Sequence, residues 1–247
     1  INTIYQSLND KKISNNLEKT ILNDGIKIEA FPVSKNGSRT IPNATQHNVP
    51  AWTIFAMFFV VTSLGSSIVK EKLSGSFMRL KTLPTSYLLS IVSKQITYVG
   101  VCLLQVSVIF SLGVWLFPLI GLPKLNLPAD LWSLLIVSFF SGWCAVSYAI
   151  CIGVFAQSQE QANGFGAVSI VILAALGGVL VPSFAMPHSV QWLINVSPLH
   201  WCLESYYDLF LEGGNFTDIL KNIAVIISIT IFIQLLTIIK LKKNNII

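Results

Sequence analysis

Long apolar runs separated by short polar segments make up most of the chain after residue 48. An α-helix needs about 20 mostly apolar residues to cross a bilayer core of about 30 Å. Because a helix satisfies its own backbone hydrogen bonds in lipid, the pattern predicts an all-α integral membrane protein, a polytopic bundle of transmembrane helices. The five visible spans cover residues 49–69, 86–117, 131–156, 162–181 and 219–239.

The segment ahead of the first run has a different pattern. Residues 1–48 are polar and mixed, with an alternation at residues 25–33 that is typical of a strand. We interpret residues 1–48 as the remainder of a small external domain. The chain opens without Met and shows no signal peptide. We therefore expect a first transmembrane helix to be missing, and the intact protein to have six spans.

Composition agrees with a membrane location. Hydrophobic residues make up 53% of the chain and charged residues only 11%, against about 25% charged residues in soluble domains. The net charge of +5 is explained by topology and anionic lipid. No Arg-rich stripe interleaves with aromatic residues, so no nucleic-acid partner is expected. The Asn-, Lys- and Ile-rich composition favours a bacterial source.

The basic residues predict the orientation. The short segment 70–84 carries an excess of Lys and Arg, as cytoplasmic membrane loops do. If it lies inside, the C-terminal lysines at positions 240, 242 and 243 also lie inside, because four spans separate them from it. Residues 1–48 then lie outside. If residues 70–84 are helical, one apolar stripe would form a docking surface for a soluble partner. The stripe would consist of Leu73, Phe77 and Leu80.

Residues 182–214 are too apolar for a free loop and too interrupted by prolines for a full span. Short apolar segments of this kind are typical of re-entrant or interfacial helices. We therefore expect an external re-entrant element, anchored by aromatic side chains at the level of the lipid headgroups. The anchors would be Trp192, Trp201, Tyr206 and Tyr207.

Candidate chemistry is sparse. His200, Glu204 and Asp208 share one helical face and could bind a divalent metal. The simpler interpretation is the wet face of an amphipathic helix, because no HExxH sequence and no second donor cluster is present. We predict no catalytic residue, no metal and no cofactor bound by this chain. No phosphate-binding loop occurs either, so energy for active work would have to come from another protein.

Three polar or flexible features have alternative interpretations. Lys94, inside the second run, either snorkels toward the cytoplasmic face, which we favour, or contacts cargo or a partner helix. The polar residues 157–163 are most simply a solvated cytoplasmic turn, with a partner contact as the alternative. The glycines at 164, 166, 177 and 178 indicate close helix packing, or alternatively the lining of a pathway.

The stretch from Ile54 to Pro84 resembles the membrane permeases of ABC exporters, the ABC-2 type transporter family. In that family an apolar span is followed by E-x-x-x-G-[ST] and a Leu-rich stretch that ends at Pro, with a Lys about ten residues later. The resemblance covers about residues 50–240. It is carried by Glu71, Gly75, Ser76, Leu80, Leu83, Pro84 and Lys94, and in the late loop by Pro182, Met186, Pro187, Ser197, Pro198 and Trp201.

The resemblance implies that residues 49–247 form an ABC-2 type transmembrane domain. Its cytoplasmic segment 70–84 would contact a separate ATPase subunit, which binds ATP and Mg²⁺, and a second permease copy would complete a homo- or heterodimer. The external element 182–214 would help to close an outer gate. The implied coupling residues are Glu71, Leu73, Gly75, Phe77, Leu80 and Pro84, and the implied gate residues are Pro182, Pro187, Pro198 and Trp201.

The function we predict is export of a hydrophobic or amphipathic cargo (a drug, a lipid or a peptide-like molecule) across the bacterial cytoplasmic membrane. Two alternatives remain open on the sequence. One is a membrane-embedded, metal-dependent enzyme of lipid or cell-wall modification that uses the face carrying His200. The other is a passive channel or immunity protein that has no ATPase.

Overall fold

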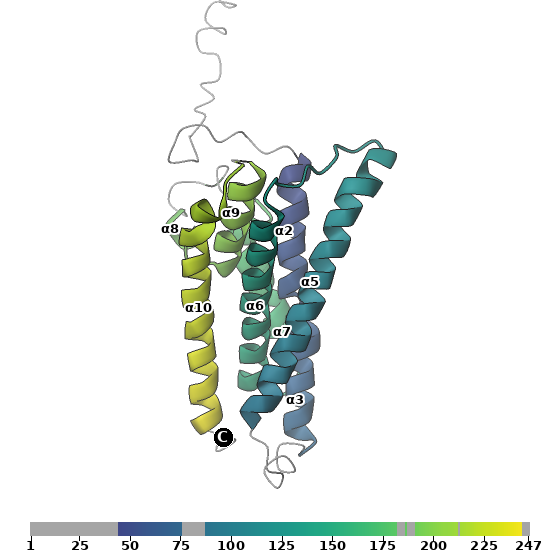
Figure 1. The fold of residues 1–247 in the computed structure, drawn as a ribbon. Helices are drawn as coiled ribbons and strands as arrows, with labels where there is room; N and C mark the ends of the chain where they lie inside the picture. Colours follow the sequence, from purple (N-terminus) through teal and green to yellow (C-terminus); the bar gives the residue numbers. More distant parts are fainter. Residues whose placement is uncertain (1–43, 76–86, 182–185, 187–190, 212, 244–247) are drawn as a thin grey trace, which may run out of the picture. The chain divides into compact units, whose positions relative to one another are not determined.

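The computed structural model describes residues 44–75, 87–181, 186, 191–211 and 213–243 (Figure 1). The described residues contain helices and turns but no strand. Four helices among them are long and apolar enough to cross a membrane, which confirms the predicted polytopic helical membrane protein. The predicted strand at residues 25–33 lies outside the described residues. The four helices are Ala44–Leu73, Leu89–Leu119, Leu131–Phe155 and Phe216–Lys243.

The first span is longer than predicted and is built from three parts. Helix α2 (Ala44–Phe58) leads into a π-helical segment, η1 (Val61–Gly65), and then into α3 (Ser66–Leu73). The helix therefore begins within the predicted external segment 1–48. It also continues past residue 69 into the basic segment. Polar residues at both ends stay helical because the apolar run between them sustains the helix on either side.

Three further helices match their predicted spans closely. They are α5 (Tyr87–Leu119), α6 (Leu131–Phe155) and α10 (Phe216–Lys243). Helix α6 is central, because it packs against α2, η1, α5, α9 and α10. Of its most apolar stretch 56% is buried, against 28% for α5 and 22% for α10. Helices α5 and α10 are therefore the most exposed of the four long helices.

The fourth predicted span corresponds to α7 (Gln159–Leu176), which is shorter than predicted and is not among the four long apolar helices. Its first turn is polar, and the chain leaves the helix at Gly177 and turns at Gly178, whose φ is 85°. A residue in this left-handed region ends a helix readily when it is glycine. The helix therefore begins three residues before the predicted run 162–181 begins, and it ends five residues before that run ends.

The segment after α7 contains two short helices, α8 (Gln191–Ile194) and α9 (Pro198–Phe210). Figure 1 shows both at the end of the bundle where α10 begins, opposite the end where α3 and α10 finish. Helix α9 packs against α2, α6, α7 and α10. The bundle thus has two distinct ends, and the candidate functional residues divide between them.

Candidate functional site

The end of α3 is joined to α5 by an ion pair. Lys94 Nζ lies 2.6 Å from Glu71 Oε1, and the two side chains are only 22% and 28% exposed. An ammonium in a transmembrane helix is costly without a partner, and this carboxylate supplies one. The contact between these two residues was not predicted from the sequence. The signal was present, since an acid and a base lay near the facing ends of consecutive spans.

The next residue, Lys72, joins α3 to the C-terminus of α6. Its Nζ donates hydrogen bonds to the carbonyl oxygens of Val154 and Ala156 at 2.8 Å each, and to that of Gly153 at 3.4 Å. The last carbonyls of a helix have no partner within the helix, and a cation there also complements the helix dipole. Lys72 therefore caps α6 from a neighbouring helix.

A glycine on α6 permits this approach. A Cβ atom added at Gly153 would lie 2.9 Å from the carbonyl oxygen of Gly65 and 3.0 Å from Cβ of Ile68. The two backbones are therefore in direct contact where η1 gives way to α3. Beside that contact, Val69 packs with Ala156 and Ala162 in a small buried cluster. Small residues allow close helix approach in membranes.

The polar stretch 157–163 is mostly helical, contrary to the prediction of a solvated turn. Ser158 is the N-cap of α7 and accepts a hydrogen bond from the backbone N–H of Gln161. Gln161 in turn accepts one from the N–H of Gln157 at 2.6 Å. Asn163 accepts a hydrogen bond from Ser66 Oγ at 2.5 Å, which links α7 to α3. The polar residues therefore begin a helix and fix it to its neighbour.

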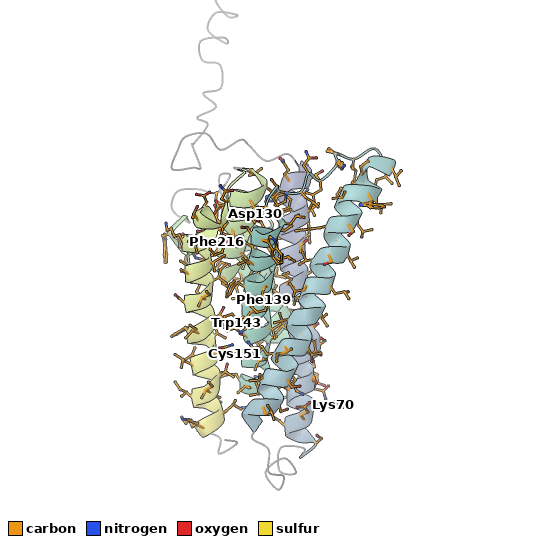
Figure 2. All side chains as sticks on the ribbon, in the orientation of Figure 1. Lys70, Asp130, Phe139, Trp143, Cys151 and Phe216 are labelled. Atoms are coloured by element: carbon orange, nitrogen blue, oxygen red, sulfur yellow. The ribbon has the colours of Figure 1, made fainter. Side chains whose placement is uncertain are left out.

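The other predicted coupling residues are only partly described. Leu73, the last residue of α3, is 65% exposed. Gly75 follows in a turn with φ of 69°, a left-handed conformation that glycine adopts readily. Phe77, Leu80 and Pro84 lie outside the described residues. Figure 2 shows Lys70 on α3, near the end where Leu73 lies.

At the opposite end, two of the four predicted gate residues are described. Pro198 is buried and opens α9, a first-turn position where its missing N–H costs nothing. Trp201 is half-buried, and its Nε1–H donates to the carbonyl oxygen of Asn195 at 2.9 Å. Pro182 and Pro187 lie outside the described residues.

Two tyrosines fix α9 to the bundle. Tyr206 is fully buried, and its hydroxyl lies 2.9 Å from Ser138 Oγ on α6. The hydroxyl of Tyr207, also buried, is hydrogen-bonded to Nδ1 of His47 on α2. Both side chains were expected to anchor the element among the lipid headgroups, but they pack into the bundle instead. They form the inner face of α9 because a phenol can bury its ring while its hydroxyl finds a polar partner.

Two further hydrogen bonds tie α9 and the residue before it to neighbouring helices. Ser197 Oγ donates to the carbonyl oxygen of Leu173 on α7 at 2.8 Å. Asn222 on α10 donates to Asp208 Oδ2 at 2.7 Å. Within the part of the chain that the structure describes, no group of three His, Cys, Asp or Glu residues could hold a metal ion.

The glycines predicted to allow packing differ among themselves. A Cβ added at Gly166 would lie 2.9 Å from a methyl group of Val61, so close approach is confirmed there. At Gly177 a Cβ would lie 2.8 Å from Ser197 Oγ, which places α9 against the end of α7. A Cβ added at Gly164 would have no neighbouring atom within 4 Å, so this glycine makes no close contact.

A hollow of about 430 Å³ lies between α5 and α6 and is almost entirely apolar. Near it, the amides of Gln95 on α5 and Gln234 on α10 both donate to Ser147 Oγ on α6, each at 3.1 Å. Interhelical hydrogen bonds of this kind hold transmembrane helices together. Phe139 and Trp143, two of the lining residues from α6, are labelled in Figure 2.

Comparison with known proteins identifies the family. No curated protein and no solved structure matches the chain. The family model described as "ABC-2 family transporter protein" matches residues 1–239, which is nearly the whole chain. The chain therefore belongs to the ABC-2 family of transporter proteins, as a multi-pass membrane permease of an ABC transporter.

Proposed function

We propose that this permease is the membrane subunit of an ATP-driven exporter of a hydrophobic or amphipathic cargo. ABC-2 permeases normally work with an ABC ATPase. The observation that carries the proposal is that the end of α3 is bound to two neighbouring spans. Glu71 and Lys72 bind α5 and α6 immediately before the predicted coupling segment continues at residue 76. A partner that displaces this segment would therefore act on three spans together.

The coupling surface comprises the described Glu71, Leu73 and Gly75, together with Phe77, Leu80 and Pro84. Leu73 is exposed at the end of α3, so its apolar side chain is available to a partner. ATP and Mg²⁺ would be held by the ATPase subunit. Hydrolysis switches the permease only if the ATPase binds its two states with different free energy.

The same proposal assigns the two sides of the membrane. Residues 70–84 and the C-terminus face the cytoplasm of a bacterium, and residues 1–48 lie outside. Figure 1 supports the pairing, since α3 and α10 finish at one end of the bundle. The element 182–214 then helps to close the external gate, with Pro182, Pro187, Pro198 and Trp201 as its gate residues. The hydrogen bonds that fix α9 to α2 and α6 support a role in closing.

A second permease copy, identical or related, completes the transporter. The apolar hollow between α5 and α6 supports a hydrophobic or amphipathic cargo, because apolar lining favours apolar ligands. Drugs, lipids and peptide-like molecules all fall in this class.

The test is co-purification with the ABC ATPase from the source cell. Phe77→Glu places a charge on the docking stripe, so we expect it to abolish ATPase recovery while the permease still inserts. Leu119→Glu is the matched control, since Leu119 is 81% exposed and lies at the end of α5 that is far from the coupling segment. Normal ATPase recovery with Phe77→Glu would sink the proposed coupling surface. Failure of the unmodified permease to recover any ATPase would sink the proposed function itself.

A further inference from the structure

Lys72 differs from the other described lysines in what its ammonium binds. Three hydrogen bonds run from its Nζ to backbone carbonyls of the last turn of α6 and the residue after it. Lys94, by contrast, pairs with the side chain of Glu71. A side-chain pair can separate by rotation about several bonds. Backbone carbonyls move only when the helix moves, so the contact of Lys72 reports directly on the position of α6.

The carbonyls that Lys72 binds are free because α6 stops there. Its C-cap residue, Ala156, is extended, with φ −64° and ψ 146°, and the next helix begins at Gln159. No further turn of α6 can supply N–H donors to these oxygens. A buried carbonyl left without a donor costs about 1–3 kcal/mol, so loss of the Lys72 donors is strongly disfavoured while the helices stay in contact.

Close packing keeps the contact in register. Gly153 lies against Gly65 and Ile68, and Val69 packs on Ala156. A shift of α3 along α6 would drive these atoms together, because packed interiors have little free volume. The end of α6 also meets α10, where Lys240 Nζ lies 5.4 Å from the ring centroid of Phe155. Movement of this end would therefore reach α10 as well.

We infer that Lys72 is a positioning residue that passes movement of the coupling segment to α6. The inference rests on the proposed function, and it names α6 as the helix that receives the movement. The movement would pass from α3 to the C-terminal end of α6 through this contact between neighbouring helices.

The test uses Lys72→Met, which keeps the length and apolar stem of the side chain but removes its donors. Lys72→Arg keeps hydrogen-bond donors at this position and should keep the nucleotide-dependent change in hydrogen exchange. Lys242→Met, an exposed lysine at the end of α10, controls for the loss of one charge at this end of the bundle. Each full-length variant is reconstituted with its ABC ATPase in lipid nanodiscs. The readout is the change in hydrogen exchange at residues 152–161 on addition of ATP and vanadate.

We expect the unmodified permease, Lys72→Arg and Lys242→Met to show the same nucleotide-dependent change. In Lys72→Met the change should shrink by at least roughly fivefold, the lower end of typical coupling factors, while ATPase binding stays normal. An unaltered change in Lys72→Met would overturn the inference. If Lys72→Met does not fold, Lys72→Leu, which also lacks donors, replaces it, and an unaltered change in that variant would equally overturn the inference. Absence of the ATPase from the unmodified complex would instead refute the proposed function.

Discussion

The two ends of the bundle are held by different chemistry. Where α3 finishes, the contacts use charged groups, Lys72 on backbone carbonyls and Lys94 on Glu71, and the two members of the ion pair stay about a quarter exposed. Where α9 packs, the contacts of Tyr206 and Tyr207 use phenol hydroxyls that are buried. Partly exposed ion pairs can be exchanged for contacts with water or a partner at small cost, whereas buried hydrogen bonds cannot.

The difference assigns different mechanical roles to the ends. At the junction that would receive movement from a soluble partner, the partly exposed pair of Lys94 and Glu71 can rearrange while Lys72 holds α3 to α6. A helix that helps to seal the opposite end must keep its place, and a satisfied buried polar network fixes a single arrangement. The predictions below test this contrast.

The largest expected effect comes from filling the contact between α3 and α6. Gly153→Leu places side-chain atoms where a Cβ alone would already lie 2.9 Å from a backbone oxygen. We expect the free energy of unfolding to fall by about 3 kcal/mol, the upper part of the range for overpacking. The measurement is unfolding by SDS in mixed micelles. Gly164→Leu is the control, because open space surrounds that position. Equal losses in both variants would contradict the close approach.

A smaller effect is expected from the ion pair. Glu71→Ala leaves the Lys94 ammonium without its carboxylate, which should lower the free energy of unfolding by about 1–2 kcal/mol. The exchange Glu71→Lys with Lys94→Glu should recover much of that loss. Because the pair is partly exposed, the cost should shrink as salt is raised from low to about 1 M. A double variant no more stable than Glu71→Ala would show that the pair contributes nothing.

A loss of about 1 kcal/mol is expected at the opposite end for Tyr206→Phe, which removes one buried hydroxyl and its bond to Ser138. Ser138 still donates to the carbonyl oxygen of Leu134, so no new polar atom loses its only partner. This cost should be the same at low and high salt, unlike that of Glu71→Ala. A salt-dependent loss would remove the distinction between the two ends.

The sequence predicted the long helices because their apolar runs carry the information locally. The run 86–117 and the run 131–156 differ from α5 and α6 by at most two residues at either end. Contacts between runs are not encoded locally. Lys72 binds carbonyls 81 to 84 residues away, and backbone oxygens give no sequence signal at all. Gly153, which permits this approach, was not among the glycines singled out from the sequence.

At the other end, the burial of the α9 tyrosines was not predicted from the sequence. Aromatic residues near membrane ends are most often headgroup anchors. Tyr206 and Tyr207 are instead buried, because α9 lies against α2 and α6. The partners that make burial favourable, His47 and Ser138, come from different spans. Pairing across spans of this kind depends on the three-dimensional packing and not on the pattern within any one run.

The smallest effect concerns Asp130, the N-cap of α6, which Figure 2 shows far from Lys70. Hydrogen bonds from Ser133, and then from the N–H of Trp132, hold the pKa of this carboxyl below its ordinary value. Its folded-state pKa is therefore depressed relative to the unfolded chain. The stabilisation it provides is present above the unfolded pKa of about 3.9 and is lost as pH falls through the folded pKa.

Acid should therefore loosen the first turn of α6 before it affects the tie at the other end, where Lys72 stays protonated. Asn caps a helix as well as Asp does but does not titrate, so Asp130→Asn should remove this pH dependence and preserve the cap. Amide exchange at residues 132–134, followed from pH 6 down to about pH 3, measures the effect. Identical acid profiles for the unmodified protein and Asp130→Asn would show that this carboxyl does not control the start of α6. In that case the two ends of α6 would not differ in their resistance to acid.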